Sequence, residues 1–276
     1  MNSKYYSLAE LRLCIESDRE IADSPLYREF YTGEGPCDIR VRVTEGKLPE
    51  RTGTLLARSE GREFYEDGGV TVFSSYPQRE GDRPFACRRD GEGSVSLTVD
   101  YPSGLWDSML FYALNIPELL VRRDVFMLHC SYVICRGEAL LFCAGKGVGK
   151  STQAALWSRY RGAEIVNGDR ALLRLTDGGL KAYGTPYCGS SEIALDRAAP
   201  VGAVILLEQG QVNELERCQG RIALTRIVEQ LSCETYQTEK AVDFALGVCS
   251  GVPVYVLRCL PDVAAVSLLE ETLWKK

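Results

Sequence analysis

The chain has 276 residues, 45% of them hydrophobic and 25% charged, which suits one large or two modest soluble domains. Its net charge of −6 at pH 7 argues against broad nucleic-acid binding, which needs a basic footprint, but is compatible with binding a nucleotide. No run reaches the roughly 18 apolar residues of a membrane span, and residues 1–6 lack an apolar signal segment. We therefore expect a cytoplasmic protein with no nucleic-acid or membrane partner.

The eleven cysteines form no C-x-x-C pair, and the chain has a single histidine. Zinc sites need clustered Cys and His ligands at short spacings, so the pattern argues against zinc. Reduced, mostly buried thiols are the simplest account of these cysteines.

Residues 1–105 are expected to form a strand-rich N-terminal region, either a meander or a small sandwich. Residues 8–15 fit a short strand or a short helix equally well. Alternation of apolar and polar residues, which is typical of half-buried strands, covers residues 37–43, 69–73 and 94–100.

Residues 106–276 are expected to form a second domain of the α/β class. A helix over residues 106–121, interrupted near Pro117, joins it to the first. Two apolar runs at residues 126–135 and 139–143 follow, and only three residues separate them. Because a parallel crossover needs a dozen or more residues, these runs predict an antiparallel hairpin. This order differs from the βαβ order of common nucleotide-binding sheets.

A glycine-rich loop directly follows the second of these strands. Residues 144–151 fit the phosphate-loop pattern (Walker A) G-x-x-x-x-G-K-[ST], with Ala144 in place of the first glycine. The glycines let backbone N–H groups surround an anion at a helix start, where the helix dipole favours negative charge. Lys150 would reach the β- and γ-phosphates, and Ser151 would bind Mg²⁺. The nucleotide-binding residues predicted from this pattern are Gly145, Lys146, Gly147, Val148, Gly149, Lys150, Ser151 and Thr152.

The rest of the chain predicts alternating strands and helices. A helix should span residues 152–160 and end at Gly162, a natural C-cap. Residues 184–191 form a small-residue loop that could line an acceptor site or simply connect two strands. The other expected elements are strands at 164–170, 171–175, 180–183, 201–207 and 252–257, and helices at 221–231, 239–249 and 261–274.

Three further side chains are candidates for chemistry beside the loop. Asp169 and Glu208 each end an apolar strand, and phosphoryl transfer needs a carboxylate to hold metal or take a proton. His129 lies one strand away from the loop, where it could contact a phosphate or the acceptor. A buried, hydrogen-bonded structural role fits this histidine equally well.

The order of these motifs resembles the catalytic domain of HPr kinase/phosphorylase, and more closely the HPr-kinase-like proteins found with peptide-modifying gene clusters. The resemblance covers residues 124–276. It implies a mixed-sheet phosphate-loop kinase fold shared with phosphoenolpyruvate carboxykinases. The motifs are Leu-His-x-Ser at 128–131, the hairpin, the phosphate loop, Asn-Gly-Asp-Arg at 167–170 and Gly-Thr-Pro at 184–186.

The resemblance also implies ATP and Mg²⁺ as cofactors, and transfer of the γ-phosphoryl group to a serine hydroxyl. Lys150, Asp169 and His129 would then be catalytic, and Ser151 with Asp169 would hold the metal. The family's paired acids are reduced to one here, because Gly168 replaces the first of them. The N-terminal region does not match that of HPr kinase, so HPr itself is not the implied acceptor. The family relative is an oligomer, which makes a homo-oligomer an expectation.

We therefore expect an ATP-dependent kinase acting on a serine or other hydroxyl of a peptide, a protein or a small molecule. Two alternatives stay open. Gly168 favours a nucleotide-binding regulatory or scaffold protein without phosphotransfer, and Glu208 favours an ATPase coupled to a partner.

Overall fold

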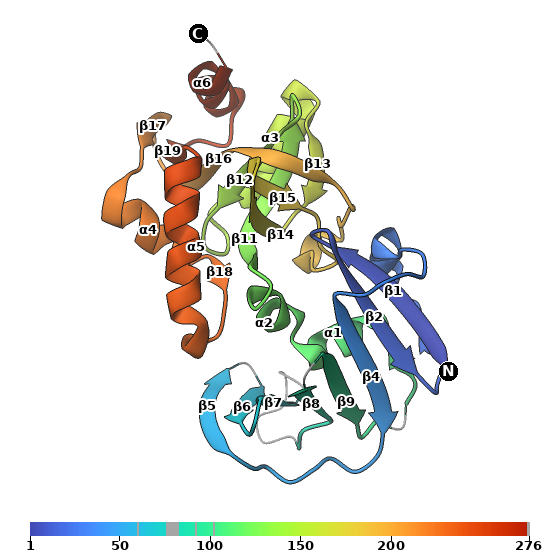
Figure 1. The fold of residues 1–276 in the computed structure, drawn as a ribbon. Helices are drawn as coiled ribbons and strands as arrows, with labels where there is room; N and C mark the ends of the chain where they lie inside the picture. The colour runs from blue at the N-terminus through green and yellow to red at the C-terminus, as the bar shows by residue number, and fades with distance from the viewer. Residues whose placement is uncertain (60, 76–82, 92, 102, 275–276) are drawn as a thin grey trace. The chain divides into compact units, whose positions relative to one another are not determined.

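A computed structural model describes residues 1–59, 61–75, 83–91, 93–101 and 103–274. The chain divides into two compact units (Figure 1). The first consists of Met1–Leu119 with Glu234–Tyr236, and the second of Leu120–Cys233 and Gln237–Lys276. The first unit thus continues past the expected boundary at residue 105.

The first unit is built on one eight-stranded sheet with the order β1-β2-β4-β9-β8-β7-β6-β5. Strands β5 to β9 form an antiparallel meander, whereas β4 pairs in parallel with both β2 and β9. The strand-rich prediction is confirmed, in the form of one mixed sheet. The strands are β1 (Asn2–Leu8), β2 (Leu11–Ser17), β4 (Ile39–Glu45), β5 (Thr54–Ser59), β6 (Arg62–Glu66), β7 (Val70–Ser74), β8 (Ala86–Gly91) and β9 (Ser94–Val99). The short strands β3 (Ile21–Ala22) and β10 (Leu105–Trp106) pair separately.

The predicted helix over residues 106–121 is two helices, α1 (Asp107–Leu114) and α2 (Ile116–Val121). The break lies at Asn115, whose φ of 49° is left-handed, and not at Pro117. Pro117 is the second residue of α2, where a helix needs no backbone N–H donor. The proline is therefore compatible with the helix that it was expected to interrupt.

The second unit contains a nine-stranded mixed sheet in which β11 and β16 are the longest strands. The main path of the sheet runs β12-β11-β14-β15-β16-β19-β17. In addition, β13 and β18 pair with β11, and β12 pairs in parallel with β16. The predicted hairpin is confirmed as β11 and β12. The strands are β11 (Val125–Cys135), β12 (Glu138–Cys143), β13 (Glu164–Asn167), β14 (Arg170–Thr176), β15 (Gly179–Tyr183), β16 (Ala198–Gln209), β17 (Glu214–Arg217), β18 (Leu231–Ser232) and β19 (Val254–Cys259).

Strand β11 divides its pairing between two sets of neighbours. Residues 125–129 pair with β14, and residues 130–135 pair with β12. The point of division lies at His129 and Cys130, which places the histidine where β12 and β14 separate. His129 also lines the cavity in which the candidate site lies.

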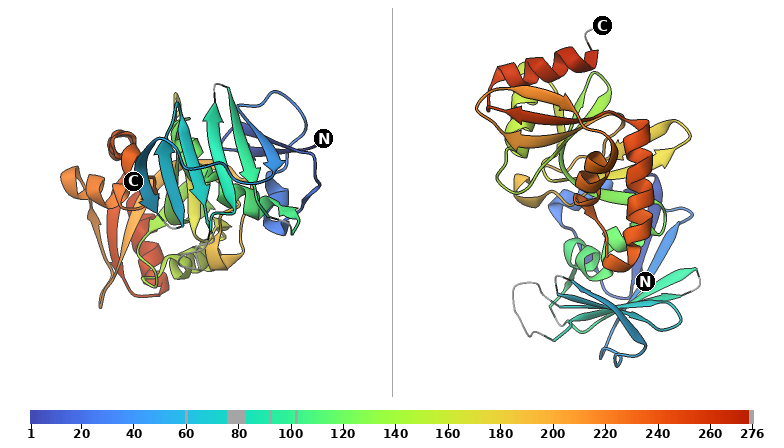
Figure 2. Two further views of the ribbon diagram at one scale, coloured as in Figure 1. Left: turned by 90° about the horizontal axis from the view of Figure 1, so that it is seen from below. Right: turned by 90° about the vertical axis from the view of Figure 1, so that its left-hand side faces the viewer.

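Helices cover the sheet of the second unit (Figures 1 and 2). Trp157 of α3 packs edge-on against Trp274 of α6 in one hydrophobic cluster, and Phe244 of α5 stacks on Phe126 of β11 in another. These contacts fix α3, and therefore the loop before it, against β12 and β16. The helices are α3 (Lys150–Arg161), α4 (Gly220–Val228), α5 (Thr238–Gly251) and α6 (Val263–Trp274).

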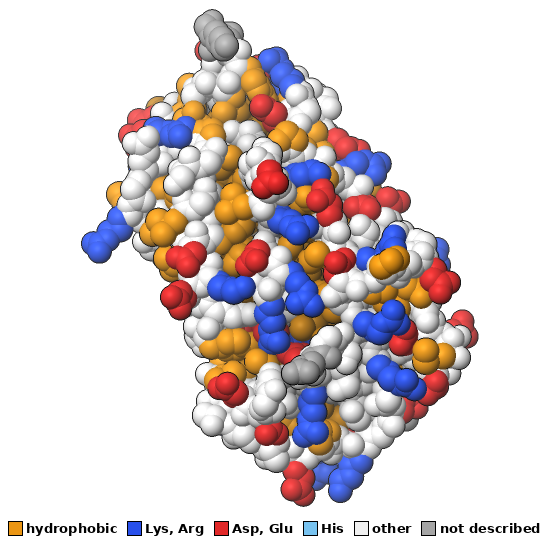
Figure 3. All heavy atoms as spheres, viewed as in Figure 1, with side chains coloured by type: hydrophobic (Ala, Val, Ile, Leu, Met, Phe, Trp, Pro, Cys, Tyr) orange, Lys and Arg blue, Asp and Glu red, His pale blue; other side chains and the backbone are white. Residues whose placement is uncertain are grey.

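Charged side chains of both signs are interspersed on the face shown in Figure 3. All eleven cysteines are free thiols, and most of them are buried. Within the described ranges, no helix is both long and apolar enough to cross a membrane. No group of three or more His, Cys, Asp or Glu side chains in the described part of the chain is placed to hold a metal ion.

Candidate functional site

The glycine-rich segment lies between a strand and a helix, as the motif requires. Strand β12 ends at Cys143 and α3 begins at Lys150. Gly147 and Gly149 have φ angles of 81° and 128°, which side-chain-bearing residues rarely adopt. Helix α3 begins two residues earlier than expected. It ends before Gly162, as predicted, where that residue has a φ of 64° and donates its N–H to Ser158 O.

Lys150 is the first residue of α3, and its side chain folds back over the loop. It is only 8% exposed, and Nζ donates a 2.9 Å hydrogen bond to the carbonyl oxygen of Ala144. An ammonium group has three N–H donors, so two remain for a ligand above the loop. The loop is thereby held closed around a positive charge beside the helix N-terminus.

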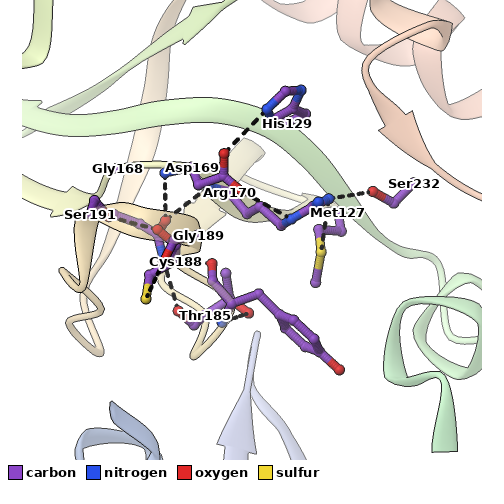
Figure 4. A network of polar contacts seen from close by, with 12 residues as sticks. Met127, His129, Gly168, Asp169, Arg170, Thr185, Cys188, Gly189, Ser191 and Ser232 are labelled. Atoms are coloured by element: carbon purple, nitrogen blue, oxygen red, sulfur yellow. Dashed lines mark hydrogen bonds and ion pairs between the residues drawn. The ribbon is translucent and has the colours of Figure 1, made fainter. Parts of the chain in front are cut away.

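His129 and Asp169 form a polar pair next to the loop (Figure 4). His129 lies opposite Arg170 in the β11–β14 ladder, and Asp169 immediately precedes β14. His129 Nε2 donates to Asp169 Oδ1 at 3.2 Å, and Arg170 Nε lies 3.3 Å from Oδ2. The backbone N–H of Cys130 also donates to the Asp169 carbonyl oxygen at 3.0 Å. The carboxylate is thus oriented by its partners on both oxygens.

The same contacts favour the ionised form of Asp169. The hydrogen bond from His129 and, next, the charge of Arg170 lower the pKa of this carboxyl group, against the opposing effect of burial. Asp169 is therefore a carboxylate throughout the neutral range, able to accept a proton or to bind a cation.

This pKa sets the pH dependence of stability. Since the folded-state pKa lies below the ordinary value of 3.8, ionised Asp169 stabilises the fold above pH 3.8, and this contribution is lost as the pH falls through the folded value. We expect the wild type to lose more free energy of unfolding than Asp169→Asn over that acid range. Urea unfolding of both proteins against pH measures this; parallel curves would contradict it.

Asn167 holds the turn that carries Asp169. Its side chain is fully buried, and Oδ1 accepts hydrogen bonds from the backbone N–H groups of Asp169 and Arg170 at 2.9 and 2.8 Å. Its Nδ2 donates to the carbonyl oxygens of Thr185 and Tyr187 at 2.8 and 3.1 Å. One amide therefore ties the Asp169 turn to the loop after β15.

Asn167→Ala is expected to lower the free energy of unfolding by about 2–5 kcal/mol, because it leaves several buried backbone groups without partners at about 1–3 kcal/mol each. Urea unfolding of the variant measures the change. Asn2→Ala, at an exposed position in β1, is the matched control and should shift stability by no more than about 0.5 kcal/mol. Equal stability of the two variants would contradict the role given to Asn167.

Gly168 leaves no space for a side chain. A Cβ built on it would lie 2.4 Å from both Cβ and Oγ of Ser191. Ser191 is itself fixed, because its Oγ donates to the carbonyl oxygen of Cys188 at 2.7 Å. Ser131 Oγ, in turn, donates to the Gly168 carbonyl oxygen at 2.8 Å. The packed turn at residues 189–191 thus occupies the space that any side chain at position 168 would need.

Gly168→Ala should destabilise the chain by about 1–3 kcal/mol through overpacking. The double variant Gly168→Ala/Ser191→Gly removes the clash, so its destabilisation should be smaller than the sum of the two single effects. A double-mutant cycle in urea measures the coupling. Strict additivity would show that the two side chains do not meet.

One cavity of about 640 Å³ collects most of the predicted site residues. All three predicted catalytic residues, Lys150, His129 and Asp169, line it. Of the predicted nucleotide-binding residues, Gly145 and Val148 do not, and Val148 instead lines a neighbouring cavity of about 350 Å³. The lining residues are His129, Lys146, Gly147, Gly149, Lys150, Ser151, Thr152, Gly168, Asp169, Arg170, Cys188, Ser190 and Ser191.

Glu208 lies outside this cavity. Its two carboxylate oxygens accept hydrogen bonds from Arg226 at 2.7 Å and from Arg258 at 2.9 Å. A carboxylate engaged by two arginines is a poor ligand for a metal ion that must also contact phosphates. Glu208 does line a separate cavity with the loop residues Lys146, Gly147 and Val148, but its engagement by two arginines makes Asp169 the better candidate to hold a metal.

Ser151 and Asp169 together offer one hydroxyl and one carboxylate to the cavity. Such hard oxygen donors suit Mg²⁺, which is usually bound by one or two carboxylates together with substrate phosphates and water. The donor set thus fits a magnesium ion that arrives with a nucleotide.

The sequence pattern did not predict the structural roles of Asn167 and Arg170, or the packing of residues 189–191 against Gly168. A signal for Asn167 was present, because Asn followed by Gly favours a turn in which the Asn side chain bonds nearby backbone N–H groups. Residues 184–191 were expected to line an acceptor site or to connect two strands, and Cys188, Ser190 and Ser191 do line the cavity. No local signal marked the contact of this turn with Gly168.

No family model matches the chain, and no curated protein matches it. Among solved structures, the Hpr(Ser) kinase/phosphatase from Coxiella burnetii resembles it with a TM-score of 0.32 and 16% sequence identity. The match covers 53% of this chain and 87% of that chain. A likeness of this size supports only a distant fold relationship and carries no argument about activity.

Proposed function

We propose that the chain is an ATP-dependent kinase that transfers the γ-phosphoryl group to a serine or other hydroxyl of a peptide, a protein or a small molecule. One observation carries the proposal: the phosphate-loop residues Lys150 and Ser151 line the same cavity as the His129–Asp169 pair. Phosphoryl transfer needs a phosphate-binding loop and a proton acceptor facing one space. A volume of about 640 Å³ lies in the range of small-molecule sites.

Each residue then has a defined role. Lys150 and the backbone N–H groups at the start of α3 bind the phosphates and stabilise charge that develops on them. Ser151 and Asp169 hold Mg²⁺, which supplies charge neutralisation of the phosphate oxygens when bound. Asp169 accepts the proton of the attacking hydroxyl, and His129 keeps the carboxylate ionised and oriented.

In the proposed reaction, one bond to the γ-phosphorus forms while another breaks. The acceptor oxygen forms a bond to the γ-phosphorus while its proton moves to an Asp169 oxygen. The bond between the γ-phosphorus and the β,γ-bridging oxygen breaks, and ADP leaves with that oxygen.

A second candidate, a nucleotide-binding protein without phosphotransfer, is favoured by Gly168. With Ser191 packed against it, the site has one acid where the resemblance implies two. Asp169 must then both bind the metal and accept the proton. If it cannot do both, the protein binds nucleotide without transferring phosphate.

The fate of the γ-phosphate of ATP separates these candidates. Purified protein is incubated with Mg²⁺ and γ-labelled ATP, with and without serine-containing acceptors. Label on an acceptor hydroxyl is the expected result. Label released only as inorganic phosphate indicates an ATPase, and bound but unaltered ATP indicates a binding protein. Absence of nucleotide binding would overturn the proposal.

A further inference from the structure

Besides Ser151 of the phosphate loop, two serines line the cavity, and both lie on the turn Gly189–Ser191 (η2). Ser191 is half-buried, and its hydroxyl is engaged by the Cys188 carbonyl oxygen. Ser190 is exposed, and its hydroxyl makes no hydrogen bond to any residue that the structure describes. Of these two serines, Ser190 is therefore the one whose hydroxyl is available as a nucleophile.

The turn is held directly against Asp169. Gly189 has a φ of 56°, and a Cβ built on it would lie 3.1 Å from Asp169 Oδ2 and 2.9 Å from its Cγ (Figure 4). The backbone beside Ser190 thus contacts the carboxylate proposed as the proton acceptor. Asn167 fixes the approach to the turn through Tyr187, and Ser191 closes it onto Cys188.

The turn that carries Ser190 is part of the same chain as the phosphate loop and lines the same cavity, so this hydroxyl does not need to be captured from solution. Fixing a nucleophile beside its reaction partner replaces a bimolecular step by a unimolecular one, and effective concentrations in well-oriented cases reach about 10⁵ M or more. The cavity is lined by Ser190, by Asp169 and by the loop residues Lys150 and Ser151. A nucleoside triphosphate on the loop would therefore present its terminal phosphate in the space that Ser190 shares.

We infer that Ser190 is a phosphoryl acceptor within its own chain, so that the protein phosphorylates itself in cis. The inference rests on the proposed function. Ser190 Oγ forms a bond to the γ-phosphorus of a bound nucleoside triphosphate, its proton passes to Asp169, and the bond to the β,γ-bridging oxygen breaks with release of the diphosphate.

The test is self-labelling in the absence of any added acceptor. The full chain is incubated with Mg²⁺ and γ-labelled ATP, and phosphate is mapped by fragmentation mass spectrometry, which separates Ser190 from Ser191. We expect up to one phosphate per chain on Ser190, at a first-order rate that is unchanged by hundredfold dilution of the protein. Ser190→Ala should remove this label, whereas the control Ser250→Ala, at an exposed position of α5 that does not line the cavity, should retain it.

Other outcomes overturn the inference in distinguishable ways. If ADP forms or an added hydroxyl acceptor is labelled while Ser190 of the wild type stays unmodified, the inference is wrong and the proposed function stands. A labelling rate proportional to protein concentration shows transfer between chains and excludes the cis reaction. If ATP binds without any turnover, or does not bind, both the inference and the proposed kinase activity fail.

Discussion

Asp169→Asn is expected to reduce kcat for phosphoryl transfer by about 10²–10⁴-fold, the usual contribution of a positioned general base. Asparagine keeps the shape of the side chain but cannot accept the proton of the attacking hydroxyl. The dissociation constant for nucleotide without metal should stay within a few-fold of wild type, because in the proposed site the loop and Lys150 bind the phosphates and Asp169 does not. Steady-state kinetics and a nucleotide titration measure the two quantities separately.

A matched control lies on the adjacent hairpin. Asp177 is exposed in the turn between β14 and β15, so Asp177→Asn should leave kcat unchanged. If Asp169→Asn keeps a turnover within a few-fold of wild type, another group takes the proton, and the role assigned to the His129–Asp169 pair is wrong.

Lys150→Met should weaken nucleotide binding by about 10- to 100-fold, as expected for losing a hydrogen bond to a charged group worth about 1.5–3 kcal/mol. Methionine preserves most of the buried stem and removes the ammonium. The contact with the Ala144 carbonyl oxygen is lost as well, so far-UV circular dichroism must show an intact fold. Displacement of a fluorescent ATP analogue measures the affinity.

Lys47→Met is the control for removing one positive charge, because Lys47 is exposed in the first unit. It should leave the nucleotide affinity unchanged. Equal affinity of Lys150→Met and wild type would mean that the ammonium does not contact phosphate, and the interpretation of the loop would have to be abandoned.

The parts of the fold that the sequence predicts are those with local causes. The hairpin of β11 and β12 followed from a short connection, and the loop before α3 from glycines at positions that have positive φ. The hairpin of β1 and β2 was missed, because its two-residue turn is Ala9–Glu10. Both residues have positive φ, yet neither is the Gly, Asn or Asp that usually marks such a turn.

The sequence pattern also did not predict which strands of the first unit pair with one another over long sequence separations. Alternation identified β4 and β9 as strands, but nothing local indicates that they are parallel neighbours. Register and partner choice depend on burial of a shared face, which only the assembled sheet defines.

The same distinction holds in the site. Lys150, His129 and Asp169 were predicted because their residue types and positions at strand ends and in the loop suit phosphoryl transfer. The contact of Gly168 with Ser191, and of Gly189 with Asp169, arises from segments twenty residues apart that Asn167 brings together. Ser190 became a candidate acceptor only through that arrangement.

In the proposed function, the γ-phosphate of a nucleotide lies in the cavity between the loop and the His129–Asp169 pair. A crystal structure with Mg²⁺ and a non-hydrolysable ATP analogue tests it directly. The expected result is a γ-phosphate with one oxygen within hydrogen-bonding distance of Lys150 Nζ and with its phosphorus facing the Asp169 carboxylate. Phosphates bound elsewhere, or no nucleotide density at saturating concentration, would contradict the claim.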